Sequence, residues 1–373
     1  MKQLLLLITL TLLVSHQVQA QQNVNGSLVF DGINRLYTVH IPTDYEPGAS
    51  LPLVINMHGF GSNRQQQQFY ANMDPIADEN SFFVVYPDGV SSAWNVGWDF
   101  GSTADDVGFI NALIDQLIAD YNIDNSRVYS TGMSNGGFMS YVLACELPNR
   151  IAAIASVTGG MVPNLLNSCD PGRSIPIMQI HGTEDDVVPY GGSLITAPVE
   201  STVGFWVANN ICNDDPVITD IEDIDPDDGS TAQNFRYGEC DESSDVEFYR
   251  IEGGGHTWPG AFIQIGSTNQ DFDASEEIWR FFDQFSLSGS VSNNEVNVAS
   301  PTLKINPNPF HDRIQIELEG LEKITIFDTS GREQLSTELA SGSSVSLAHL
   351  PNGVYFISIH VGRHQFLERI VKR

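Results

Sequence analysis

The feature that most constrains this chain is an alternation, over most of its length, of short apolar runs with segments of helical periodicity. The apolar runs lie at 51–57, 82–86, 127–131, 151–157 and 175–180. Such runs are typical of strands buried on both faces of a parallel sheet. Apolar residues from Ile110 to Tyr121 and from Ile278 to Phe285 recur at helical spacing, the second set after the capping-box pair Asp273 and Glu276. This pattern predicts an α/β domain with a mostly parallel central sheet, preceded by an antiparallel hairpin near 30–42.

The pattern changes after a segment rich in Ser and Asn, residues 286–300, which has the composition of a linker. Beyond it, apolar and polar residues tend to alternate in segments 313–319, 323–328, 345–350, 353–361 and 365–372. Turn residues separate most of these segments. We therefore expect residues 301–373 to form a small all-β sandwich, after an α/β domain that spans residues 21–285.

The first twenty residues, 1–20, have the pattern of a secretory signal peptide. Lys2 precedes an apolar run at 4–14, and Val18 to Ala20 offers a small-residue cleavage site. The run is too short to cross a bilayer, although a membrane anchor is the alternative interpretation. No later stretch approaches 18 apolar residues, so we expect an exported protein with no stable transmembrane segment.

Export permits disulfides, and four cysteines allow three pairings. The nearest-neighbour pairs Cys145–Cys169 and Cys212–Cys240 would close short loops, and we favour them. No cysteine has CxxC spacing, so no metal site is predicted, and no dinucleotide or other cofactor motif is present. The acidic segment 214–228 lacks the ligand spacing of a calcium loop and is expected to be a solvated loop.

The formal net charge of −30 is carried by one part of the chain. Residues 21–297 contain 39 acidic residues and eight arginines but no lysine, whereas acids and bases balance in 298–373. A negative domain repels phosphate backbones and anionic lipid, so no nucleic-acid partner is expected. The same charge is compatible with a neutral polymer as substrate. Acid enrichment without lysine also suggests a saline or cold extracellular setting.

The segment 132–136, Gly-Met-Ser-Asn-Gly, fits the G-x-S-x-G nucleophile elbow. It follows the apolar run 127–131 and precedes a helix-like segment, which is the strand–turn–helix context that the elbow requires. Its glycines permit a tight turn that exposes the Ser134 hydroxyl above the sheet edge. We predict that Ser134 is a nucleophile, which needs a base to activate it.

In proteins with such an elbow, the acid and then the histidine follow the serine along the chain. The turn after the run 175–180 supplies three competing acids, Glu184, Asp185 and Asp186. His256 follows three glycines after a strand-like segment, and it is the predicted base. The developing oxyanion needs two donors, for which we predict the N–H groups of Asn135 and Phe60, the latter in the turn after the run 51–57.

Residues 50–285 resemble the secreted α/β-hydrolase esterases grouped with polyhydroxybutyrate depolymerases and feruloyl esterases. The matching segments are HGFGSN (58–63), WNVGW (94–98), ADDVGFINALID (104–115), RVYSTGMSNGG (127–137), HGTEDDVVPY (181–190) and GGGHTWPG (253–260). The resemblance implies a Ser134–His256 pair with Asp185 as the acid. It also implies that Trp258 and residues near Trp94 line a substrate groove; core packing is the alternative for both tryptophans.

Residues 300–373 resemble the C-terminal sorting domain of the type IX secretion system, on the segments INPNPF (305–310), KITIFDTSGRE (323–333), LPNGVYFISI (350–359) and RIVKR (369–373). That resemblance implies an interaction with the secretion machinery and an extracellular or outer-surface location. A carbohydrate-binding sandwich is the alternative.

Together these features predict a secreted serine carboxylester hydrolase acting on polymer-linked esters. The substrates that compete are feruloyl esters or acetyl esters of plant polysaccharide and polyhydroxyalkanoate, the last corresponding to a polyhydroxybutyrate depolymerase proper. Two further alternatives are a serine peptidase of the prolyl-oligopeptidase type and a non-catalytic polysaccharide-binding protein.

Overall fold

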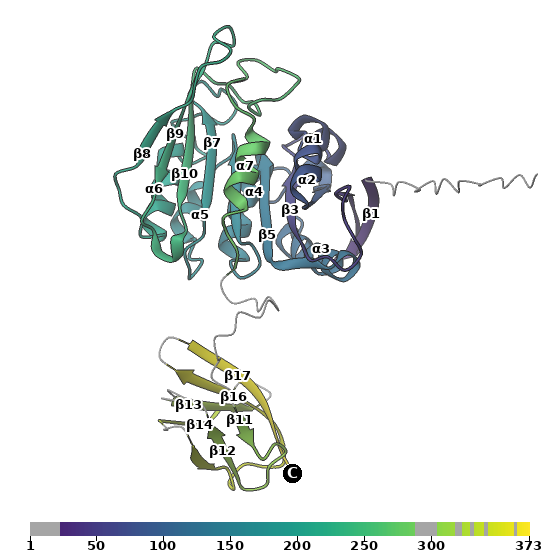
Figure 1. Ribbon diagram of the computed structural model, residues 1–373, viewed down its shortest axis with the longest axis vertical. Coiled ribbons are helices and arrows are strands. Elements are labelled where there is room, and N and C mark those ends of the chain that lie inside the picture. Colours follow the sequence, from purple (N-terminus) through teal and green to yellow (C-terminus); the bar gives the residue numbers. More distant parts are fainter. Residues whose placement is uncertain (1–22, 288–303, 318–322, 329–331, 339–341, 362–363) are drawn as a thin grey trace, which may run out of the picture. The chain divides into compact units, whose positions relative to one another are not determined.

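The computed structural model describes residues 23–287, 304–317, 323–328, 332–338, 342–361 and 364–373 (Figure 1). The predicted signal peptide, 1–20, and all of the predicted linker except residues 286 and 287 lie outside the described residues. The chain divides into two compact units between Ser292 and Asn293. Leu287 still belongs to the first unit, because its N–H donates to the Ser126 carbonyl.

The first unit is built on a ten-stranded sheet of order β1-β2-β4-β3-β5-β6-β7-β10-β9-β8. Its six central strands run parallel, and an antiparallel hairpin flanks them at each edge (Figure 1). The strands are β1 (Asn23–Phe30), β2 (Ile33–His40), β3 (Leu51–Met57), β4 (Phe83–Pro87), β5 (Ile123–Met133), β6 (Ala153–Val157), β7 (Ile177–Gly182), β8 (Val217–Asp220), β9 (Thr231–Tyr237) and β10 (Val246–Glu252).

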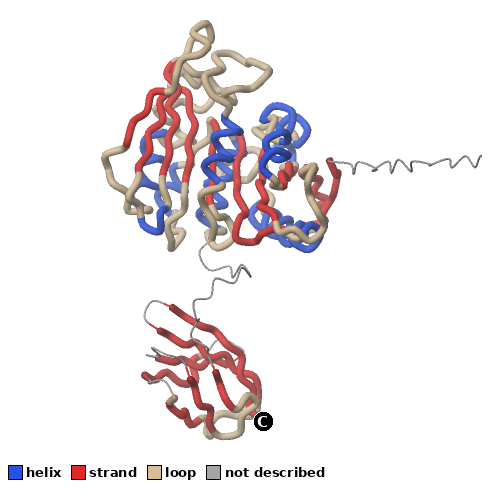
Figure 2. Tube along the Cα trace, viewed as in Figure 1, coloured by secondary structure: helices blue, strands red, loops and turns tan. Residues whose placement is uncertain are grey.

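Helices cover both faces of this sheet (Figure 2). They are α1 (Arg64–Ala71), α2 (Asp74–Asn80), α3 (Asp106–Tyr121), α4 (Asn135–Glu146), α5 (Pro163–Ser168), α6 (Val199–Asn209) and α7 (Ala274–Phe282), with single 3-10 turns at Val90–Ser92 and Asp241–Ser243. The sequence determines where two of them begin. The Asp105 carboxylate accepts the Gly108 N–H at the start of α3, and the Asp273 carboxylate accepts those of Ser275 and Glu276 at the start of α7.

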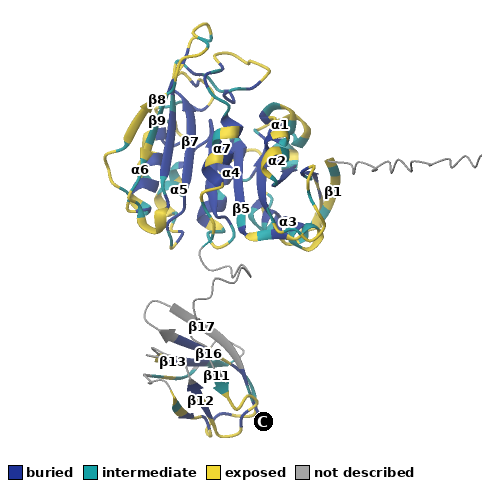
Figure 3. Ribbon diagram, in the orientation of Figure 1, coloured by how far each residue is buried: buried dark blue, intermediate teal, exposed yellow. Residues whose placement is uncertain are grey.

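The apolar runs are buried as their composition predicts. Leu53 and Ile55 of β3 face a core that the sheet shares with α3, α4 and α6, while Val54 faces a second core shared with α2 and α7. The dark strands of Figure 3 show this burial, whereas many of the loops at the sheet's ends are exposed. The predicted α/β fold with a mostly parallel sheet is confirmed.

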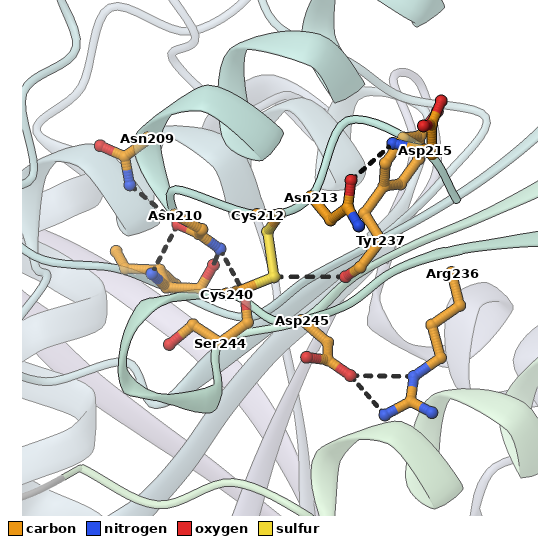
Figure 4. The surroundings of a disulfide bond; sticks show 11 residues. Asn209, Asn210, Cys212, Asn213, Asp215, Arg236, Tyr237, Cys240, Ser244 and Asp245 are labelled. Carbon is orange, nitrogen blue, oxygen red and sulfur yellow. Dashed lines mark hydrogen bonds and ion pairs between the residues drawn. A yellow bond between two sulfur atoms is a disulfide. The ribbon is translucent and has the colours of Figure 1, made fainter. Parts of the chain in front are cut away.

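Both predicted disulfides are present, Cys145–Cys169 and Cys212–Cys240. The second joins the end of α6 to the segment after β9 (Figure 4). Next to it, the buried Asn210 amide donates to the carbonyls of Ile175 and Ser244. The disulfide and the amide together tie α6 to the outer strands of the sheet.

The second unit contains two antiparallel sheets, β11-β12-β15 and β14-β13-β16-β17. Their strands are β11 (Lys304–Asn306), β12 (Arg313–Glu317), β13 (Lys323–Asp328), β14 (Glu333–Glu338), β15 (Ser343–Ser346), β16 (Gly353–Val361) and β17 (His364–Lys372). Ile314 of one sheet and Ile324 and Ile357 of the other belong to a single buried cluster. The expected small β-sandwich is therefore what the described residues form.

Candidate active site

Three loops that carry the predicted catalytic side chains leave the same edge of the main sheet. Ser134 follows β5, Asp185 follows β7 and His256 follows β10. These strands are parallel, and β7 and β10 are direct neighbours. Because parallel strands end at one edge, residues far apart in the sequence are brought together there.

Ser134 occupies a strained turn between β5 and α4, with φ 53° and ψ −119°. Its N–H donates to Val157 O of β6, which fixes the turn against the sheet. The flanking glycines have no room for a side chain, because a Cβ on Gly132 or Gly136 would overlap the Met57 carbonyl at the end of β3. Strain of this kind at a serine between such glycines is the geometry of a nucleophile elbow.

Asp185 alone of the three competing acids is buried, with its side chain fully shielded from solvent. One carboxylate oxygen accepts the N–H groups of Val187 and Val188, and the other lies 2.7 Å from His256 Nδ1. Glu184 and Asp186 are exposed. The structure thus brings Asp185, and neither neighbour, onto the predicted base.

The glycines before His256 allow its loop to pass directly over the acid loop. Gly253 has a φ of 76°, which favours glycine. A Cβ on Gly182 would overlap the Gly254 carbonyl, and that carbonyl accepts the Glu184 N–H. The His256 side chain is 15% exposed, so one edge of the imidazole remains open toward a substrate.

Ser134 and His256 are both within the described residues, and the structure contains no hydrogen bond between their side chains. A hydrogen bond between a nucleophile and its base is commonly long or poorly aligned before a substrate binds, and it shortens in the complex with substrate.

The turn after β3, which carries the predicted second oxyanion donor, lies against the serine. A Cβ on Gly59 would lie 3.4 Å from Ser134 Cβ. Among the backbone hydrogen bonds of the described turns and loops, neither the Phe60 N–H nor the Asn135 N–H acts as a donor. The Asn135 side chain is occupied elsewhere, since its Oδ1 accepts the Trp94 N–H at 2.6 Å and its amide donates to Trp94 O.

Trp94 and Trp258 do not line a groove, contrary to the prediction. Each is only 1% exposed. The Trp94 indole N–H donates to His58 O, and the Trp258 indole N–H donates to Ser275 Oγ. Both therefore pack in the interior with their polar atoms satisfied, which leaves no surface for a ligand.

Other aromatic residues near the serine are accessible. Trp98, from the same WNVGW segment as Trp94, contacts Phe138 on the first turns of α4 and stacks on Phe100 with ring centroids 5.1 Å apart. Phe100 in turn meets Phe60. Phe60 and Phe100 are about half exposed, at 53% and 48%. We call Phe60, Trp98 and Phe100 the aromatic wall.

Two further histidines close strands at this edge and bond to turn backbone. His58 donates from Nδ1 to Gly59 O and accepts the Gly89 N–H at Nε2. His181 contacts Val188 O through Nε2. Burial lowers the pKa of both imidazoles, because the low dielectric disfavours the charged form.

The described residues include no cluster of three or more His, Cys, Asp or Glu side chains arranged to hold a metal ion. Among them, no helix is long and apolar enough to cross a membrane.

Comparison with known proteins agrees with this geometry. Residues 101–213 match the family model described as phospholipase/carboxylesterase, and residues 304–373 match that of a secretion system C-terminal sorting domain. A bifunctional acetylxylan esterase/xylanase from Neocallimastix patriciarum is 30% identical over 70% of this chain and 35% of its own length. Feruloyl esterase C from Emericella nidulans is 29% identical over 68% of this chain and 86% of its own length. The chain thus spans about a third of the first relative and most of the second.

Among solved structures, a thermostable esterase superposes with a TM-score of 0.50 at 18% identity, covering 71% of this chain and 63% of that one. The fold, with a strained serine turn after its central strand, is that of an α/β-hydrolase. Within that class, the chain is similar to carboxylic ester hydrolases named as feruloyl and acetylxylan esterases, and its residues 304–373 match a secretion-system sorting domain.

Proposed function

We propose that the protein is a secreted serine esterase that hydrolyses polymer-linked esters through Ser134, His256 and Asp185. The observation that carries this proposal is the 2.7 Å contact between the buried Asp185 carboxylate and His256 Nδ1, at the edge where the strained Ser134 turn ends β5.

In the proposed mechanism, Ser134 Oγ attacks the ester carbonyl while His256 Nε2 takes its proton. Asp185 accepts the Nδ1–H of the imidazole, which fixes the reactive tautomer and stabilises the imidazolium that forms. The N–H groups of Asn135 and Phe60 hold the oxyanion. His256 returns the proton to the leaving alcohol, and water then hydrolyses the acyl-enzyme by the same route.

The proposed substrates are feruloyl or acetyl esters of plant polysaccharide, by analogy with the names of the two relatives. The aromatic wall adds a physical reason to favour the feruloyl group. A planar aryl acyl group can stack on the exposed faces of Phe60 and Phe100 beside the nucleophile, whereas an acetyl group is too small to reach them.

Export is the second part of the proposal. The signal-like segment 1–20 would direct the chain across the inner membrane, and the sorting domain at 304–373 would direct it to the secretion machinery. The protein would then act outside the cell or at its outer surface, where disulfides persist.

The test is the Ser134→Ala variant assayed with p-nitrophenyl acetate and with a fluorophosphonate probe. The wild type should turn over the ester and become labelled, while a folded variant should do neither. Turnover by the variant would rule out Ser134 as the nucleophile. Parallel assays of the wild type on methyl ferulate, acetylated xylan and polyhydroxybutyrate film would then identify the substrate.

A further inference from the structure

A second imidazole, which the proposed mechanism does not use, lies next to the carboxylate of Asp185. His181 is fully buried, and its Nε2 lies 3.4 Å from Asp185 Oδ2, the oxygen that also contacts His256. If His181 were charged, one carboxylate oxygen would be shared between two imidazolium ions. Its protonation state therefore bears directly on how strongly Asp185 can hold His256.

The buried side chains around His181 fix that state. Tyr141 donates its O–H to Gln179 Oε1 at 2.7 Å, so the other end of the amide, Nε2, must be the donor. Gln179 Nε2 lies 3.0 Å from Gly159 O and 3.1 Å from His181 Nδ1. A donor facing Nδ1 requires that this nitrogen be unprotonated. The proton of the neutral ring is then on Nε2, where it donates to Val188 O at 2.9 Å.

This network reaches the acid at one end and the helix that follows the nucleophile at the other. Val188 receives the Nε2–H of His181 at its carbonyl and gives its own N–H to Asp185 Oδ1, so the imidazole anchors the turn that holds the carboxylate. At the other end, Tyr141 belongs to α4, which begins at the nucleophile. The chain of contacts Tyr141–Gln179–His181 therefore links the helix behind Ser134 to the turn that carries Asp185.

The other ionisable groups around His181 do not set the protonation state of its imidazole. The Tyr190 ring lies 6.2 Å away, and Arg250 is the register partner of His181 on β10, with its guanidinium donating to Gln233 and placed over Phe235. His256 lies beyond the shared carboxylate.

We propose that Gln179 and His181 are positioning residues for the acid: the Gln179 amide keeps His181 neutral, so that Asp185 is reserved for His256. The inference rests on the proposed role of Asp185. The acid limb of the pH profile of esterase activity then depends on Gln179, which touches neither the substrate nor the nucleophile.

The Gln179→Glu variant tests this directly, because it replaces the donor facing Nδ1 by a carboxylate that favours a protonated His181. An opposite charge at this distance raises an imidazole pKa by about 1–3 units. Below that raised pKa His181 is charged and competes with His256 for Asp185, so the acid limb of kcat/KM for p-nitrophenyl acetate should move to higher pH. The change should fall on kcat with KM unaltered.

The shift must disappear in the Gln179→Glu/His181→Gln double variant, because no titrating group is left at position 181. Gln233→Glu is the matched control, since it adds the same charge to β9 two strands away, beside Arg250, and should leave the limb in place. Should Gln179→Glu fail to fold, Gln179→Met removes the donor without adding charge, and the limb should move the same way by less.

An unmoved limb in the folded Gln179 variants, or a shift that persists in the double variant, would overturn the inference. Failure of the proposed function gives a different result, namely a wild type without esterase activity, or activity that survives Ser134→Ala.

Discussion

Replacing Gly136 by Ala tests how closely the serine turn and the oxyanion turn are packed. The new Cβ would lie 2.9 Å from His58 O and would overlap Met57 O, and real Cβ contacts essentially never fall below 3.0 Å. Both obstacles are backbone atoms of the chain that leads into Gly59 and Phe60. The turn after β3 must therefore move by on the order of 1 Å, since no side chain can rotate away.

A displacement of that size acts on both stability and catalysis. Overpacking of this kind costs about 1–3 kcal/mol of unfolding free energy. Loss of one oxyanion donor lowers kcat by about 10²–10³-fold. We expect Gly136→Ala to lose at least about 10²-fold in kcat for p-nitrophenyl acetate, with a smaller change in KM.

Gly204→Ala is the matched control, because a Cβ there meets nothing within 4 Å on the exposed side of α6. It should leave kcat unchanged and stabilise the fold by about 0.4–1 kcal/mol in urea unfolding. If Gly136→Ala keeps kcat within about threefold of the wild type, the two turns are not in the contact that the structure shows, and the oxyanion assignment fails with it.

Four further outcomes follow from the structure. Asp185→Asn should lower kcat by about 10⁴-fold, whereas the same change at the exposed neighbour Asp186 should leave kcat within about twofold, measured with p-nitrophenyl acetate. Phe100→Ala should raise KM for methyl ferulate by about 3–10-fold, through loss of about 1 kcal/mol of aromatic stacking, and leave acetyl ester kinetics unchanged; equal effects on both esters would contradict the wall's role. Removing the Cys212–Cys240 disulfide by double serine substitution should cost about 3 kcal/mol in urea unfolding, and a change near zero would contradict this. Burial lowers the folded-state pKa of His58, so the unfolded chain binds the extra proton first; stability is complete above about pH 6.5 and falls as pH drops toward the folded pKa. The melting temperature should therefore fall less between pH 7.5 and 5.5 in His58→Gln than in the wild type, and parallel curves would refute it.

The sequence was most informative where a residue type has few structural uses. The glycines around Ser134 and before His256 are required by positive φ or by close backbone contact. Because no other residue meets these requirements, the glycines form a motif that is recognisable in the sequence. Runs that are apolar throughout predicted the central strands, because a strand covered on both faces tolerates little else. For the acid, composition left three neighbours open; the family resemblance implied Asp185, and in the structure burial separates Asp185 from the other two.

The prediction for the two tryptophans was wrong for the opposite reason. An indole serves equally well in a core or in a groove, and spacing alone does not say which face of a loop it occupies. Trp94 and Trp98 lie four residues apart in one segment, yet one is 1% exposed and the other forms part of the aromatic wall. Phe100 carried no sequence signal at all, because the wall is assembled from separate turns that meet only in the folded chain.

The few arginines of the α/β domain are all engaged in contacts within the fold. Six of the eight arginines between residues 23 and 287 form ion pairs with acids, most completely the buried pair of Arg35 and Asp106 at 2.6 Å. The other two are also engaged: Arg173 donates to three carbonyl groups and Arg250 donates to Gln233. The acids of this domain far outnumber its arginines, so its net field is negative whether or not each cation is paired. A substrate that approaches this surface gains nothing from carrying negative charge, which favours esters on an uncharged polymer over those on a polyanion.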